Sequence, residues 1–176
     1  MRSTSTVVVW GPFIRIGHWL LVASIVVTWL TRTGARTSHE WAGYVALAVV
    51  AARTVWGFVG TGHIRFANFV HGLPETWIYA VAVMQRREPR YIGHNPLGGY
   101  MIVALLLVTT ATGVTGWLYT TDRYWGIEWV ERLHATLADL LLVLAALHVA
   151  GVIAASFRHR ENLIAAMLHG RKRGSG

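Results

Sequence analysis

Four long apolar windows dominate the chain, and they limit its fold more than any other feature. Each has about 18 residues or more, enough for a helix to cross the ~30 Å hydrocarbon core of a bilayer. The sequence predicts membrane spans over about 13–31, 38–59, 96–119 and 127–157. With 54% hydrophobic and 14% charged residues, the composition is also that of a small multi-pass membrane protein. We expect one all-α domain over 1–176, built as an antiparallel four-helix bundle.

Basic residues are distributed unevenly between the two sides of the predicted membrane. The smaller set belongs to the connections after the first and third spans and comprises Arg32, Arg36, Arg123 and Arg132. The larger set belongs to the N-terminus, the segment between the second and third spans, and the C-terminal tail. It comprises Arg2, Arg15, Arg53, Arg65, Arg86, Arg87, Arg90, Arg158, Arg160, Arg171, Lys172 and Arg173. Because positive loops stay in the cytoplasm, both termini are predicted to be cytoplasmic.

The net charge of +8 is therefore explained by contact with the lipid bilayer, with no need for nucleic acid as a partner. The segment 61–95 is too polar to span and rich in aromatic residues, so we expect it to lie in the cytoplasmic interface. The chain has no cysteine, which excludes disulfides, covalent c-type haem attachment and cysteine-ligated iron–sulfur clusters. Any redox centre must use histidine, methionine, carboxylate or backbone ligands.

Histidines in the apolar windows supply such ligands. His134 and His148 lie fourteen residues apart in the last window. This is about four helical turns, or ~21 Å, so both imidazoles leave nearly the same side of the helix at different depths. His18 lies on the cytoplasmic side of the first span, and His39 lies on the outer side of the second span. Depth therefore pairs His18 with His148 and His39 with His134, and predicts two stacked bis-histidine b haems enclosed by the bundle.

These histidines have two other interpretations. A single intramembrane histidine is most often a polar residue hydrogen-bonded to a neighbouring helix, but four that pair by depth favour a functional role. Zinc is a weaker interpretation, since its ligands must converge on one point and the two pairs are ~20 Å apart along the helix. In the third span, glycines and threonines favour close helix packing and also leave room for a flat macrocycle.

Arginines near the helix ends are the expected partners of haem propionates, because a guanidinium binds a carboxylate through two hydrogen bonds. For each of them, contact with lipid headgroups is an equally good explanation. The candidates are Arg15, Arg53 and Arg65 for the inner haem, and Arg36 and Arg132 for the outer haem. His94, next to Asn95-Pro96, is a further candidate that could reach the inner haem or a bound quinone.

These residues stand within motifs that cover almost the whole chain. In order they are Val9-Trp10-x-Pro12, Arg15-x-x-His18-Trp19, His39-Glu40-x-x-Gly43-Tyr44, Arg53-x-x-Trp56-Gly57-Phe58, Arg65-Phe66-x-x-Phe69, Gly93-His94-Asn95-Pro96, Glu131-x-Leu133-His134 and His148-x-x-Gly151. With these motifs the chain resembles the bacterial di-haem cytochrome b561 family and the related b-type cytochrome subunit of nickel–iron hydrogenases.

The resemblance implies a protein of the bacterial inner membrane with two haem b groups held by histidines of the first, second and fourth helices. It also implies electron transfer between a quinone pool (ubiquinone or menaquinone) and a redox partner such as a periplasmic c-type cytochrome or a hydrogenase. Two alternatives remain open. One is a superoxide:quinone oxidoreductase, in which Arg36, Arg123 and Arg132 would attract the anion. The other is a haem-free membrane anchor for another subunit.

Overall fold

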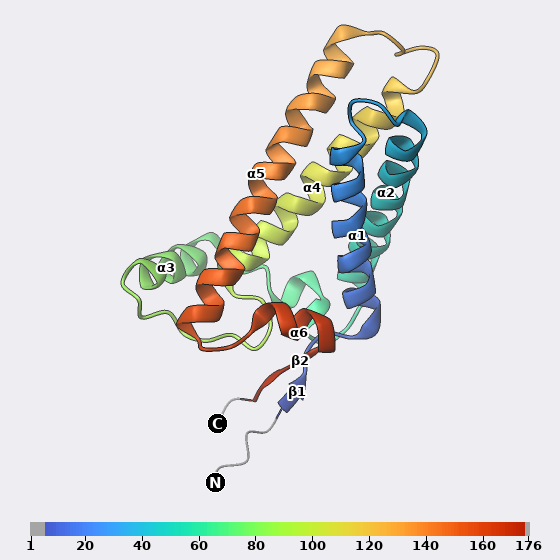
Figure 1. Cartoon of the computed structure of the whole chain (residues 1–176). Helices are drawn as coiled ribbons and strands as arrows, with labels where there is room; N and C mark the ends of the chain where they lie inside the picture. Colours follow the sequence, from blue (N-terminus) through green and yellow to red (C-terminus); the bar gives the residue numbers. More distant parts are fainter. Residues whose placement is uncertain (1–5, 175–176) are drawn as a thin grey trace. The chain divides into compact units, whose positions relative to one another are not determined.

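The computed structural model describes residues 6–174, apart from the side chain of His63 (Figure 1). Arg2, which belongs to the basic set above, lies outside this range. The structure is mostly helical. In chain order its elements are β1 (Thr6–Val8), α1 (Pro12–Leu30), α2 (Arg36–Val59), η1 (Gly62–Ile64), η2 (Phe66–Asn68), α3 (Leu73–Met84), α4 (Pro96–Tyr119), α5 (Glu128–Arg158), α6 (Leu163–His169) and β2 (Arg171–Arg173).

Four helices, α1, α2, α4 and α5, are long and apolar enough to cross a membrane. They have 19, 24, 24 and 31 residues, so even the shortest extends ~28 Å along its axis. In the most apolar window of each helix, only 6–17% of the residues are buried within the protein. Most of this apolar surface is therefore left for lipid or for a bound apolar group, and the chain is a multi-pass membrane protein.

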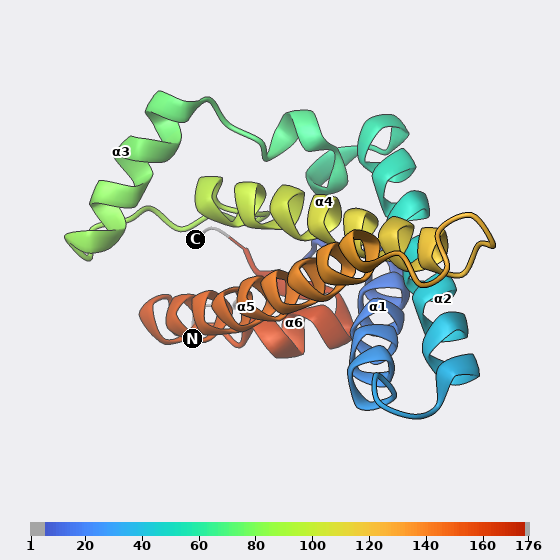
Figure 2. The same ribbon diagram turned by 90° about the horizontal axis from the view of Figure 1, so that it is seen from above.

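The described residues form two compact units, and each long helix contributes to both. Unit 2 consists of 16–54 and 104–146. Within it, α1 and α2 lie side by side as a helical hairpin, which Figures 1 and 2 show from two directions. The helices approach closely where α4 has glycine: a Cβ on Gly113 would lie 2.4 Å from Leu47 Cγ of α2.

Unit 1 consists of 6–15, 55–103 and 147–174. Thr6–Val8 forms a strand that pairs antiparallel with Arg171–Arg173. Beside this sheet, Val9, Trp10 and Ile14 form a small buried cluster that includes the partly buried side chain of Met167. Thr6–Val8 and Arg171–Arg173, near the two limits of the described range, are thus held together in unit 1.

Candidate functional site

His39 and His134 come together in unit 2. His39 lies in the first turn of α2 and His134 in the second turn of α5, and their ring centroids are 6.1 Å apart at an interplanar angle of 75°. The two rings are therefore neighbours that come from different helices. Within the described residues there is no group of three or more histidines, cysteines, aspartates or glutamates placed to hold a bare metal ion.

Each of these imidazoles is oriented by a main-chain carbonyl of the neighbouring helix. His39 Nδ1 lies 2.9 Å from the carbonyl oxygen of Thr28 in α1, and His134 Nδ1 lies 3.0 Å from that of Thr112 in α4. A carbonyl can only accept a hydrogen bond, so Nδ1 of each ring must carry the proton. The lone pair of each neutral ring is then on Nε2, which is the nitrogen left to bind a metal.

Local sequence explains how the rings reach these positions. His134 can approach α4 because residue 116 is glycine, and a Cβ there would lie 2.9 Å from His134 Cε1. Thr115 Oγ1 also lies 3.4 Å from His134 Nδ1, although this hydroxyl already donates to main-chain carbonyls of its own helix. His39 lies in the first turn of α2, where Arg36 pairs with Glu40 at 2.6 Å. Glu40 is thus engaged on its own helix.

The other predicted histidine pair is divided between the two units. His18 belongs to unit 2, where its ring contacts Trp19 edge-on at 5.4 Å, and His148 belongs to unit 1. The pairing of His18 with His148 remains a prediction from their depths.

His94 packs in the aromatic part of unit 1. Its ring lies 4.5 Å from that of Trp10 and 5.2 Å from that of Phe69. Phe69 is 2% exposed, so this face of the imidazole is in a tightly packed environment. A role of His94 toward a haem or a quinone remains a prediction.

The five candidate arginines have different surroundings. Arg36 pairs with Glu40 and stacks over the Trp125 ring at 4.2 Å, and Arg132 pairs with Glu128. Arg15 donates one guanidinium hydrogen bond to the carbonyl of Leu168, while its buried Nε has no hydrogen-bond partner among the described residues. Arg53 is half-buried and Arg65 is exposed. Arg15 therefore has a buried donor available to an anionic group.

Sequence reasoning did not find the two carbonyls that orient His39 and His134. Every residue has a carbonyl, so residue type gives no signal for such a partner. Gly116 is one of several small residues in the third span, and nothing in the sequence distinguishes it from the others.

A family model described as prokaryotic cytochrome b561 matches residues 9–170, which is nearly the entire chain. The chain belongs to the prokaryotic cytochrome b561 family. Membership covers both compact units, including all four histidines predicted from depth.

Curated relatives agree with this assignment. A protein of Azotobacter vinelandii is 25% identical over 97% of this chain and 90% of its own length. A protein of Bradyrhizobium diazoefficiens is 25% identical over 95% of this chain and 86% of its own length. A third, from Azotobacter chroococcum, is 26% identical over 76% and 67% of the two chains. Each is named "Probable Ni/Fe-hydrogenase B-type cytochrome subunit". No solved structure matches significantly.

Membership of this cytochrome b561 family, together with four apolar helices, makes the protein a membrane b-type cytochrome that acts in electron transfer. Haem b is accordingly its cofactor.

Proposed function

We propose that the protein carries electrons across the bacterial inner membrane through two bis-histidine haems, between a quinone and a redox partner. The observation that carries this proposal is the His39–His134 pair. Two rings 6.1 Å apart, each with Nδ1 directed at a carbonyl, have the form expected of two ligands that share one metal atom through Nε2.

The residues around this pair fit a haem. Ligation by two neutral histidines suits haem iron, and the cofactor supplies the one-electron chemistry once bound. The carbonyls of Thr28 and Thr112 fix the orientation and tautomer of the ligands, and a hydrogen bond from Nδ1 to a carbonyl makes the imidazole a better donor. The apolar helices keep water away from the ligands and so influence the potential.

A second haem held by His18 and His148 completes the proposal. The argument rests on depth along the helices, since α1 and α5 place these residues near the same side of the membrane if both termini are cytoplasmic. Two centres at different depths provide a route through the bilayer that one centre at a single depth does not. Arg15, whose buried Nε has no hydrogen-bond partner among residues 6–174, is a propionate partner in this proposal on that side.

The partners are proposed from the relatives. Their name associates them with a nickel–iron hydrogenase, so we propose a hydrogenase-like redox subunit at one end of the path. A periplasmic c-type cytochrome is the other partner proposed for that end. Ubiquinone or menaquinone is proposed at the other end. No specific observation favours the superoxide alternative, because Arg36 and Arg132 are already paired with carboxylates.

The proposal is tested by haem quantification and redox titration of the purified protein and of single His→Ala variants. We expect two b haems per chain in the unchanged protein. His39→Ala and His134→Ala should lose the same potential component, and His18→Ala and His148→Ala the other. His159→Ala, which removes an imidazole outside both pairs, is the matched control and should keep both components. One haem per chain, or loss of the same component in His18→Ala and His39→Ala, would contradict the proposed pairing.

A further inference from the structure

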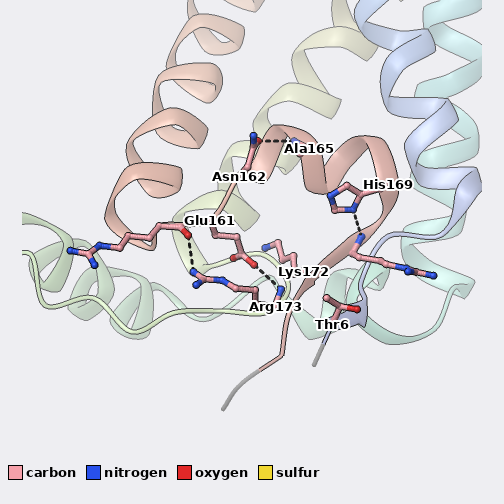
Figure 3. A pocket seen from close by; sticks show the side chains of 9 residues that line it. Thr6, Glu161, Asn162, Ala165, His169, Lys172 and Arg173 are labelled. Carbon is pink, nitrogen blue, oxygen red and sulfur yellow. Dashed lines mark hydrogen bonds between the residues drawn. The ribbon is translucent and has the colours of Figure 1, made fainter. Parts of the chain in front are cut away.

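The C-terminal segment of unit 1 forms a pocket that the proposed electron path does not use. It has a volume of about 300 Å³ and lies between the end of α5, α6 and β2 (Figure 3). Its charged or titratable lining residues are Arg160, Glu161, His169, Arg171, Lys172 and Arg173.

Several hydrogen bonds hold this pocket in shape. The guanidinium of Arg173 donates to the carbonyls of His159 and Arg160, each at 2.8 Å, which ties β2 to the end of α5. The side chain of Asn162 accepts a hydrogen bond from the Ala165 N–H at 2.8 Å and caps α6. The pairing of β2 with β1 fixes the other side. The pocket is therefore a built feature rather than a gap beside a loose tail.

The charge of the lining is strongly positive. Glu161 is its one carboxylate, and this group is already paired with Arg90 at 2.9 Å and accepts the Arg173 N–H at 3.0 Å. Lys172, labelled beside Glu161 in Figure 3, is only 8% exposed. Burial lowers the pKa of this ammonium group, and the nearby Glu161 only partly opposes the effect. An anion in the pocket would compensate the basic groups that Glu161 leaves unpaired.

The position of the pocket identifies the kind of anion. It follows directly after Arg158, where the fourth membrane-spanning helix ends, and so lies at the depth of lipid headgroups. On α6, Ile164 and Leu168 are four residues apart on one face and are 48% and 60% exposed. Ala165 follows Ile164 and His169 follows Leu168 in the sequence, and both of these following residues line the pocket. An apolar ridge beside a basic pocket suits a molecule that has both an acidic head and an apolar tail.

We propose that this pocket binds the phosphate group of an anionic phospholipid, with the acyl chains lying against Ile164 and Leu168. Arg160, Arg171 and Arg173 are the exposed arginines of the pocket. The guanidinium of Arg173 is engaged with two carbonyls, whereas the side chains of Arg160 and Arg171 are not engaged in hydrogen bonds within residues 6–174. They are the residues available to the phosphate. The inference rests on the membrane placement of α5 and not on the haem ligation proposed above.

The test uses the full-length protein purified in detergent, titrated with phosphatidylglycerol or with phosphatidylcholine of the same acyl chains and followed by native mass spectrometry. Inorganic phosphate is a third arm that separates a lipid from a free anion. The variant Arg160→Gln/Arg171→Gln removes two exposed charges from the pocket. The control Arg87→Gln/Arg123→Gln removes two exposed charges elsewhere. Haem absorbance is recorded in parallel, so that failure of the haem proposal and failure of the lipid proposal remain distinguishable.

We expect the unchanged protein to prefer phosphatidylglycerol over phosphatidylcholine. The pocket variant should bind phosphatidylglycerol about thirtyfold more weakly, as expected when two basic side chains no longer attract an anionic headgroup. The control should bind as the unchanged protein does. Equal binding of the two lipids, which needs no variant to measure, would overturn the proposal. Equal weakening in the control variant, or equally tight binding of inorganic phosphate, would also overturn it.

Discussion

Replacing Gly116 with alanine tests the site at its tightest contact. The added Cβ would lie 2.9 Å from His134 Cε1 and 3.2 Å from His134 Nδ1. Carbon atoms do not approach this closely, so the imidazole would have to move. Any such movement strains or breaks the 3.0 Å hydrogen bond from His134 Nδ1 to the Thr112 carbonyl, which fixes the tautomer of the ring.

The size of the effect follows from three contributions. Forcing an extra methyl group into a packed site costs about 1–3 kcal/mol, and loss of one hydrogen bond costs about 0.5–1.5 kcal/mol. Alanine is favoured over glycine in a helix by about 0.5–1 kcal/mol, which offsets part of this. We therefore expect a net loss of about 1–3 kcal/mol, and Tm should fall by about 2–4 °C for each kcal/mol in a chain of this size.

Gly43→Ala is the matched control, because it is also within a helix of unit 2 and a Cβ there would meet nothing within 4 Å. It should leave Tm unchanged or raise it slightly. Thermal unfolding and redox titration of both variants give the comparison, and only Gly116→Ala should shift the potential component that depends on His39 and His134. If the two variants share the same Tm and the same potentials, then the inferred contact between residue 116 and the imidazole of His134 is wrong.

Three further outcomes are expected. Gly170→Ala should lower the free energy of unfolding more than Gly126→Ala does. Both glycines have positive φ, at 81° and 74°, but only at residue 170 would a Cβ meet a carbonyl, which lies 2.5 Å away. Thermal unfolding of the two variants measures the difference. Acid should destabilise the chain partly through Glu161. Burial acts to raise its pKa, but hydrogen bonds from Arg90 and the backbone and the nearby positive charges outweigh this and keep the pKa below 4.5. The stabilisation is therefore present above pH 4.5 and is lost as the pH falls through the folded-state pKa. Glu161→Gln should flatten this acid side of a Tm–pH profile, and an unchanged slope would contradict the assignment. Burial is the main cause that raises the pKa of Tyr79 to about 12, and the nearby carboxylate of Glu88 is the second. Ultraviolet titration should therefore show a tyrosine that ionises at that pH, and Tyr79→Phe should abolish that step.

The spans were predictable from sequence because length and apolar content alone decide whether a helix can cross a membrane. The four predicted windows are all present as long helices. The β1–β2 pairing was not predictable, since Thr6–Val8 and Arg171–Arg173 are far apart in the sequence and strands of three residues are too short to show a periodic signal. The ligand orientation was not predictable either, because it depends on carbonyls whose direction is set only by the packing of neighbouring helices.

The two carbonyls that orient these histidines link haem binding to helix packing. His39 belongs to α2 but is held by α1, and His134 belongs to α5 but is held by α4. A ligand shared by both histidines would therefore connect all four helix segments of unit 2, two through the histidine side chains and two through the carbonyls. Since any group that binds only the folded state stabilises it, loss of this ligand should loosen the α1–α2 and α4–α5 contacts together. If this ligand is the haem proposed above, the pair in unit 2 would act as a structural cross-link as well as a redox site, because each histidine is anchored to a neighbouring helix and not to its own.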